Sequence, residues 1–369
     1  MHIPIIRPVL GDEELENVGK CLASGYLTQG QFVARFEKSV SDHLACRHAV
    51  AVTSGTAALH LALLALGIGP GDEVVVPSLT WVATANAVAY VGATPVFADV
   101  RPETFTLDPD DLVRALTPRT RAVVAVHLFG LCADMAEISR IAADRDLFLV
   151  EDAACALGSS YGGRPAGTLG HVGCFSFHPR KVITTGEGGM LTTEDDGLDS
   201  ALRELRNHGC VPLPAGSPPW AMPDVPRCGY NYRMTDIQGA IGCAQMGKIE
   251  AILAERARLA AVYTELLASS SLILPAVPED RVHSWQSYVV RFRTTAARNA
   301  AAERLAAADI ECRPGTHAAH RLRWQAGHAL RTDCCPCAAL CEDTSLALPL
   351  VHGMAREDQA RVAALLCQD

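Results

Sequence analysis

Between Ala49 and Thr193 the chain repeats one pattern, in which a short apolar run is followed by an amphipathic stretch of helical period. The apolar runs predict strands at residues 49–52, 73–76, 94–97, 122–126, 148–150, 174–177 and 190–193. Between them, cap or turn signals predict helices that begin near Ala57, Thr80, Asp108, Ala133 and Asp195. Strands that alternate with helices form a parallel sheet covered on both faces. The pattern therefore predicts an α/β domain of doubly wound character.

Two regions that flank this pattern differ from it. Residues 13–23 and 32–44 have helical periodicity, and we expect these two helices to pack outside the sheet. Between residues 208 and 229 lie six prolines, which exclude a regular helix or a central strand. A loop of this length in a compact protein is usually functional or interfacial, and its closeness to the next motif favours a role in an active site.

The C-terminal third predicts a smaller α+β unit. A long helical pattern leads away from the sheet and is followed by shorter candidate elements, at residues 235–267, 287–293, 296–308 and 310–313. We place the domain boundary where this helix leaves the sheet. Residues 1–245 then form the large domain and residues 246–369 the small one.

Composition narrows the class of protein. The formal net charge of −9, without a Lys/Arg run, argues against a nucleic-acid or acidic-membrane partner. The first seven residues lack the pattern of a signal peptide, and no apolar run reaches about 18 residues, so we expect a cytoplasmic protein. The 14 cysteines form no regular framework and are interpreted as reduced thiols. Cys334, Cys335, Cys337 and Cys341 lack paired zinc knuckles, and no metal site is expected.

A candidate anion site follows the first predicted strand. Ser54, Gly55 and Thr56 open an Ala/Leu-rich helix, so that backbone N–H groups, hydroxyls and the helix dipole converge there. The same residue types also serve as an ordinary helix N-cap. This segment by itself predicts either a phosphate cup or a simple cap.

An acidic pair, Glu151 and Asp152, stands at the carboxyl end of a buried strand, the edge at which open α/β sheets bind ligands. A carboxylate there needs a partner. A pyridinium nitrogen is one such partner, because an Asp that keeps it protonated makes the ring an electron sink. A capping Asp on the following turn is the alternative interpretation of this segment.

Lys181 differs in setting from the other three lysines, Lys20, Lys38 and Lys248, which look like surface residues of helices. It lies in a turn between two apolar strands, followed by three glycines that allow close approach of a ligand to the backbone. Desolvation and a covalent imine both suit a lysine that acts as an amine near neutral pH. A surface lysine with an apolar stem is the alternative.

The order of these signals is more specific than any one of them. The anion site, Trp81, Asp152 and Lys181 each follow a predicted strand. By residue type alone, Trp81 suits a core as well as a cofactor stack, and His127 is more often a satisfied strand-end histidine than a catalytic one.

This arrangement resembles the sugar aminotransferases of the DegT/DnrJ/EryC1/StrS family, within the aspartate-aminotransferase-like enzymes that use pyridoxal 5′-phosphate (PLP). The likeness runs from residue 25 to residue 350, with matching stretches at residues 25–30, 54–63, 71–74, 76–77, 127–130, 151–154, 181–189 and 229–234. It implies a PLP-dependent transferase of fold type I, with a mostly parallel sheet in the large domain and a smaller α+β C-terminal domain.

The resemblance also implies roles for single residues. Ser54, Gly55, Thr56 and Ser176 would surround the cofactor phosphate. Trp81 would stack on the pyridine ring, and Asp152 would pair with the ring nitrogen. Lys181 would bind the cofactor covalently. Asn231 would reach the phosphate of the neighbouring subunit, which implies a homodimer with shared active sites.

Two features of the match are loose, and the role of one matched residue, Glu187, is open. The family usually has Gln or His near the phenolic oxygen of the cofactor, where this chain has Cys155, a weak hydrogen-bond former. That contact would be lost, replaced by water or supplied by another residue. His317 and His320 lie in a poorly matched segment and are candidates for substrate contact. Glu187 is expected to order the glycine turn through backbone N–H groups, and its role towards substrate stays open.

The resemblance implies a PLP-dependent aminotransferase, which passes through the pyridoxamine phosphate form during turnover. The donor would be an amino acid, most often L-glutamate in relatives, and the acceptor a keto-sugar. The perosamine-synthase-like spacing of the C-terminal third favours a nucleotide-linked keto-deoxysugar. A keto-sugar dehydratase of the same family has histidine in place of Lys181, which argues against that class. A cyclitol aminotransferase that uses an inosose and glutamine stays open, as does an inactive regulatory protein, which would be expected to lose Lys181 or Asp152.

Overall fold

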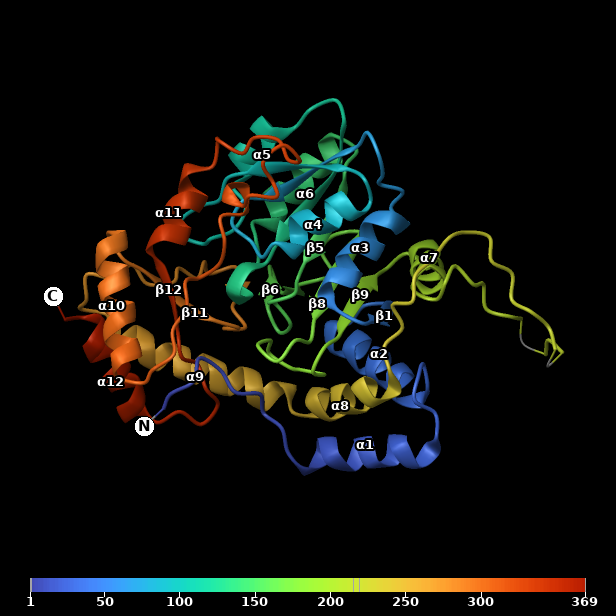
Figure 1. Ribbon diagram of the computed structural model, residues 1–369, viewed down its shortest axis with the longest axis horizontal. Coiled ribbons are helices and arrows are strands. Elements are labelled where there is room, and N and C mark those ends of the chain that lie inside the picture. Colours follow the sequence, from blue (N-terminus) through green and yellow to red (C-terminus); the bar gives the residue numbers. More distant parts are fainter. Residues whose placement is uncertain (1, 215, 219, 369) are drawn as a thin grey trace.

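The computed structural model describes residues 2–214, 216–218 and 220–368. A seven-stranded sheet lies at its centre with helices on both sides (Figure 1). In spatial order its strands are β1 (His48–Val52), β9 (Gly189–Thr193), β8 (Val172–Ser176), β5 (Phe148–Asp152), β4 (Thr120–Val126), β2 (Glu73–Pro77) and β3 (Thr94–Ala98). Each strand expected from the sequence is therefore present, with ends that differ by at most two residues.

The central sheet is mostly parallel, as the resemblance implies, and β9 is its exception. Five neighbouring strands of this sheet, β3, β2, β4, β5 and β8, are parallel to one another. Strand β9 runs antiparallel to both of its neighbours, β8 and β1. As a result Gly189, the first residue of β9, pairs with Val52 at the end of β1 and with Ser176 at the end of β8. One edge of the sheet thus carries the last residues of β1, β5 and β8 together with the first residue of β9. We call it the site edge.

The helices follow the expected order with two local differences. They are α1 (Asp12–Ser24), α2 (Gln31–Leu44), α3 (Gly55–Ala65), α4 (Ala83–Tyr90), α5 (Pro109–Ala115), α6 (Met135–Asp144), α7 (Asp196–Arg206), α8 (Asp236–Gly247), α9 (Ile249–Leu267), α10 (Thr295–Ala307), α11 (Pro336–Thr344) and α12 (Arg356–Leu366). The helix expected near Thr80 begins three residues later, at Ala83. The long helical pattern of residues 235–267 is divided at Lys248, whose backbone leaves the helical region (φ −110°, ψ 1°).

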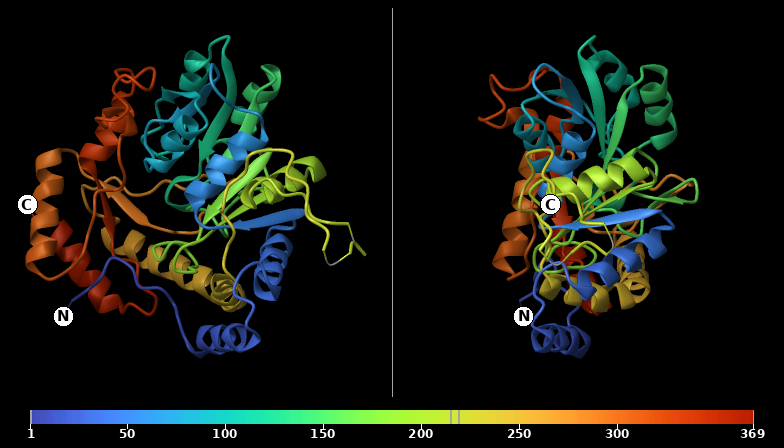
Figure 2. Two further views of the ribbon diagram at one scale, coloured as in Figure 1. Left: turned by 45° about the vertical axis from the view of Figure 1, so that its right-hand side comes forward. Right: turned by 90° about the vertical axis from the view of Figure 1, so that its right-hand side faces the viewer.

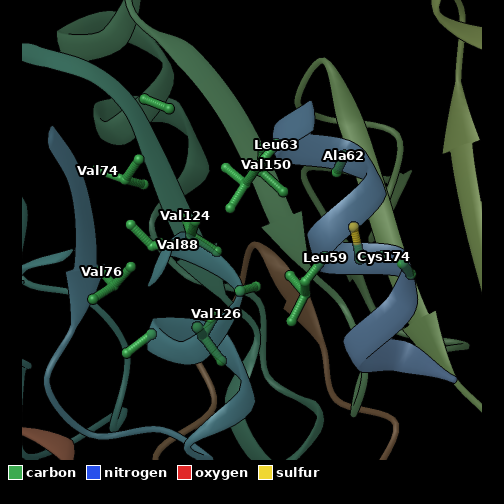
Figure 3. Packing of buried hydrophobic residues seen from close by; sticks show 14 of the residues in the cluster. Leu59, Ala62, Leu63, Val74, Val76, Val88, Val124, Val126, Val150 and Cys174 are labelled. Carbon is green, nitrogen blue, oxygen red and sulfur yellow. The ribbon is translucent and has the colours of Figure 1, made fainter. Parts of the chain in front are cut away.

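Helix α3 is held on all sides by the core. Seven of its eleven residues are buried, and Leu59 and Leu63 belong to one apolar cluster with Val150 of β5 and the valines of β2 and β4 (Figure 3). Burial of one such side chain stabilises the fold by about 1.5–3 kcal/mol. Because the helix cannot shift without opening this core, its N-terminus is fixed relative to the site edge.

The C-terminal part has its own small sheet and apolar cluster. Strands β11 (Tyr288–Arg291) and β12 (Ser345–Leu348) pair antiparallel, and α9, α10 and α12 pack around them (Figure 2). Ile3 pairs with Ile310 and joins this cluster, so the start of the chain lies against the C-terminal part. The proposed domain boundary after residue 245 falls within the last turn of α8 and stays a prediction.

Three short strands form a separate sheet beside these two parts. They are β10 (Arg281–Val282), β6 (Ser160–Tyr161) and β7 (Arg164–Pro165), in that order. Two 3₁₀ turns complete the elements, at Leu128–Gly130 and Ala319–Arg321.

The described residues between 208 and 229 form a long irregular segment that projects from the body, as the sequence predicts (Figure 1). We call it the arm. Its base is closed by a hydrogen bond from the Val211 N–H to the Asp224 carbonyl (2.9 Å) and by an ion pair between Arg227 and Glu204 (3.1 Å). Within the described ranges no helix has the length and apolar character needed to cross a membrane.

Candidate functional site

The N-terminus of α3 lies directly against the site edge. The Ser54 hydroxyl accepts a hydrogen bond from the Ala57 N–H (3.1 Å), so Ser54 is an N-cap. A Cβ atom on Gly55 would lie 2.8 Å from the Ser176 Cβ, so only glycine allows this close approach. The backbone N–H groups of Gly55 and Thr56 belong to the first helical turn, where such groups have no intrahelical acceptor. The cap and the anion cup are therefore compatible interpretations of one turn.

Asp152 is buried at the end of β5, with its carboxylate turned towards α4. One carboxylate oxygen accepts the Thr84 hydroxyl (2.8 Å) and the other accepts the Ala154 N–H (3.2 Å). A carboxylate offers about four acceptor positions, so capacity for a further donor remains. Thr84 was not singled out by the sequence analysis. Its only signal there is its place three residues after Trp81, in the first turn of α4.

Glu151, the other member of the acidic pair, has a different role. Its fully buried carboxylate accepts from the Gly167, Leu169 and Gly170 N–H groups and from the His127 ring (2.8 Å). The other ring nitrogen of His127 accepts the Ala133 N–H, so Nε2 is the donor to Glu151. These contacts tie the loop after β7 to the end of β4. His127 is thus a satisfied structural histidine, as its residue type suggests.

Lys181 is half-buried, and its amine faces the turn that follows Asp152. Lys181 Nζ donates to the Cys155 Sγ at 3.1 Å. The backbone of Lys181 is held by a bond to the His178 carbonyl (2.8 Å). Burial lowers the pKa of His178, which keeps this neighbouring imidazole neutral near pH 7. The structure therefore brings Lys181, Cys155 and the Asp152 turn together.

The glycine turn after Lys181 is ordered by threonines. The Thr184 hydroxyl accepts the Gly186 N–H (2.9 Å), and the Thr185 hydroxyl donates to the Glu187 carbonyl (2.7 Å). Gln238 of α8 donates to the same carbonyl (2.6 Å). Glu187 thus takes part through its main-chain oxygen, and its exposed side chain forms none of the hydrogen bonds that hold this turn among the described residues. This corrects the expectation that its carboxylate orders the turn through N–H groups.

Trp81 is more than half exposed (56%), which excludes a core role. Its ring lies 5.7 Å from the ring of His317 at 35°. The His317 carbonyl accepts the Thr80 N–H (3.1 Å), so a C-terminal segment is bound alongside the start of α4. His317 also lies 3.5 Å from Glu342. Of the two candidate substrate histidines, His317 stands beside Trp81.

His320 has a different environment. Its Nδ1 is hydrogen-bonded to the Ser78 hydroxyl, and its ring packs edge-on against Phe97. Burial lowers the pKa of His320. The His320 ring is thus held by Ser78, which follows β2, and by Phe97 of β3. It supports the segment that carries His317.

Asn231 does not join Lys181 within the chain. Its backbone pairs with Asn207 after α7, and its side chain is exposed. The neighbouring Tyr230 and Tyr232 rings stack on each other at 5.1 Å and turn towards His60 of α3.

The cysteine cluster of residues 334–341 does not form a metal centre in the described part of the chain, where no group of three or more His, Cys, Asp or Glu side chains is placed to hold an ion. Cys335 and Cys341 are buried, and burial raises the pKa of each thiol to about 12. The Cys337 N–H donates to Asp99 (2.9 Å).

Known proteins share the sequence pattern and the overall fold of this chain. Residues 8–367 match the DegT/DnrJ/EryC1/StrS aminotransferase family. The chain belongs to this family. It is 42% identical, over all of its length and 98% of the other chain, to a GDP-perosamine synthase of Caulobacter vibrioides. It is 38% identical, over 87% of its length and 86% of the other chain, to a GDP-perosamine synthase of Escherichia coli O157:H7.

Among solved structures, a putative sugar aminotransferase of Streptococcus pneumoniae in its PMP form superimposes with a TM-score of 0.94, at 28% identity, over 99% of this chain and 98% of the other. The same protein has also been solved in its PLP form, with a TM-score of 0.93. The chain is therefore a PLP-dependent aminotransferase of fold type I, as the resemblance implies, and its class is that of the sugar aminotransferases.

The site edge fits this cofactor. The turn at Gly55 brings the N–H groups at the start of α3 close to Ser176, and N–H groups at a helix N-terminus suit a phosphate. The Asp152 carboxylate keeps acceptor capacity for a ring N–H. At the other side Lys181 presents an amine next to the thiol of Cys155. These are an anion cup, a ring-nitrogen acceptor and a nucleophilic amine.

Proposed function

We propose that this enzyme moves an amino group from an amino acid, L-glutamate, to the keto carbon of a nucleotide-linked keto-deoxysugar. The observation that carries the proposal is the 42% identity over the whole chain with a protein named GDP-perosamine synthase. The product in that name is an amino sugar on a nucleotide, and transamination makes an amine from the corresponding ketone. The proposed acceptor is therefore a GDP-linked keto-deoxysugar.

The residues of the site edge are proposed to have separate roles in the reaction. When bound, PLP supplies an electron sink for the bond broken at the donor's Cα. Lys181 would hold the cofactor through its amine and, once released, move the proton between Cα and C4′. Asp152 would keep the ring nitrogen protonated, and Thr84 supports that carboxylate by its hydrogen bond.

Binding and orientation would fall to the surrounding side chains. Ser54, Gly55, Thr56 and Ser176 are proposed to hold the phosphate at the N-terminus of α3, where the helix dipole favours an anion. Trp81, which is exposed and faces His317, is proposed to cover the ring. His317 and Glu187 are proposed to contact substrate.

We further infer that the working unit is a homodimer, with Asn231 of one chain at the phosphate of the other. Asn231 is exposed, and its backbone is bridged to Asn207 after α7. The arm next to it exposes Trp220 (81%) and Met222 (86%), and large apolar side chains of this kind suit burial against another surface.

The test of the substrate is a panel of acceptors run with two donors. GDP-linked and other nucleotide-linked keto-deoxysugars and inososes would be offered with glutamate or glutamine, and the aminated product identified by mass spectrometry. We expect turnover of a GDP-linked ketone with glutamate. Turnover of an inosose with glutamine would instead identify a cyclitol aminotransferase. A protein that binds PLP, but whose cofactor absorbance no amino donor changes, would be the inactive regulatory form.

A further inference from the structure

The four lysines of the chain have partners of two kinds. Lys20, Lys38 and Lys248 each form an ion pair with a carboxylate, namely Glu16 (2.7 Å), Asp42 (2.5 Å) and Glu14 (2.6 Å). Lys181 takes part in none of the ion pairs found among the described residues, and its amine donates to the sulfur of Cys155 instead. The lysine placed at the site edge is therefore the one whose amine is bound by a thiol and not by a carboxylate.

Cys155 is held firmly in that position. It lies in the same turn as Asp152, and its carbonyl accepts the hydroxyl of the buried Ser284 (3.2 Å). Ser284 is itself tied to the Gly130 carbonyl through its N–H (3.0 Å). Gly130 is kept as glycine by its left-handed backbone (φ +106°) and by its closeness to Ser284. The backbone that carries the thiol is thus held by the large domain and by the C-terminal part together.

We propose that Cys155 is a positioning residue that holds the amine of Lys181 whenever that amine is not joined to the cofactor. The inference rests on the proposed function, in which Lys181 is freed in each half of the cycle. An N–H that donates to sulfur leaves the nitrogen lone pair directed elsewhere. The amine is then ready to accept a proton or to attack the cofactor.

The chemistry of sulfur explains why a thiol suits this task. A carboxylate in the same place would favour the charged ammonium form of the lysine, which has no free lone pair. Sulfur is a weak acceptor, so it orients the amine and releases it at little cost. The other charged or titratable groups around the pair are His178, Arg180, Glu187 and Arg313.

The test compares Cys155→Ala, Cys155→Ser and Cys155→Asp with the wild-type enzyme. Apoenzyme is mixed with PLP, and the rate of covalent capture is followed by absorbance and by borohydride trapping. Both half-reactions, kcat and KM are then measured across pH. Cys46→Ala is the matched control, because Cys46 is also half-buried and its thiol donates only to a backbone carbonyl, that of His48.

We expect Cys155→Ala to slow covalent capture and kcat by about two- to fivefold, the factor of one weak hydrogen bond, with little change in KM. Cys155→Ser keeps an acceptor and should recover most of the rate. Cys155→Asp should move the acidic limb of the kcat profile to higher pH, because its charge favours the ammonium. Cys46→Ala should match the wild type.

Equal capture rates and pH profiles in all three variants would overturn the proposal, while borohydride labelling of Lys181 would still support the proposed function. Labelling of another residue in the wild-type enzyme would overturn both. If Cys155→Ala does not fold, the serine and aspartate variants decide: the proposal then fails if their pH profiles coincide.

Discussion

The polar side chains of the site edge are held by hydrogen bonds within the chain, whereas large apolar side chains of the arm are exposed to solvent. At the site edge, Glu151 receives four hydrogen bonds, Asp152 receives two, and Lys181 donates to a fixed thiol, all within one chain. In the arm, Trp220 and Met222 are more than four-fifths exposed. The hydrogen bonds of the first region are made within a single chain, whereas the second region presents apolar surface to solvent.

The two regions meet different requirements, those of catalysis and those of contact with another surface. Chemistry needs groups that are held in place before the substrate arrives, and a packed sheet edge provides this. An exposed apolar segment is stabilised only when another surface covers it. We therefore expect changes at the site edge to alter rates within a chain, and changes near the arm to alter how chains work together.

The largest effect is expected for Lys181→Ala. Loss of the amine removes both the covalent link and the proton transfer, so kcat should fall by at least about 10³-fold. Lys38→Ala is the control, because its exposed ion pair contributes little. Mass spectrometry after borohydride reduction should place the cofactor on the peptide that contains Lys181. Labelling at Lys20, Lys38 or Lys248 would contradict the assignment.

The next largest effects distinguish the two neighbouring carboxylates, because one variant should change the rate and the other the stability. Asp152→Asn should lower kcat by about 10²- to 10³-fold and leave the melting temperature nearly unchanged, because a neutral amide cannot keep the ring nitrogen protonated. Glu151→Gln should instead lower the melting temperature by several degrees, because its amide nitrogen would face buried N–H donors. Steady-state kinetics and calorimetry measure both. An unchanged rate in Asp152→Asn would assign the electron-sink role to another group.

A smaller effect on rate is expected for Asn231→Ala, which should weaken cofactor retention without altering Lys181. If sites are shared, a mixture of Lys181→Ala and Asn231→Ala chains contains dimers with one intact site and regains activity. The dimer should bury more than roughly 2,000 Å², as obligate interfaces do. Sedimentation measures the assembly. A fully active monomer would show that each chain builds its site alone.

The smallest effect is on stability below neutral pH. Burial lowers the pKa of His283 to about 3, and this ring stacks on Trp285 at 4.0 Å. Because the unfolded chain binds a proton near pH 6.5 and the folded chain does not, stability is full above that pH and falls as pH drops towards 3. At pH 5 the loss should be about 2 kcal/mol. The free energy of unfolding, measured by denaturation at pH 7 and pH 5, should fall less for His283→Phe than for the wild type.

Much of the fold was readable from the sequence, because the signals that specify it are local. The alternation of apolar runs and amphipathic stretches located the seven strands, and parallel strands carry their carboxyl ends to one edge. Ser54, Asp152 and Ser176 therefore met where their places in the sequence predicted. The reversal of β9 was not readable, because a five-residue apolar strand has the same pattern in either direction.

For residues of like type that lie close together in the sequence, tertiary structure alone decided which partners each one contacts. Glu151 and Asp152 are adjacent in sequence, yet opposite side-chain directions along β5 give one to a structural loop and the other to Thr84, 68 residues away in the chain. Likewise His317 reaches Trp81 while His320 is bound behind it. Periodicity in a sequence reports which face a residue occupies. Which distant group meets it depends on how the faces pack, and that information is not local.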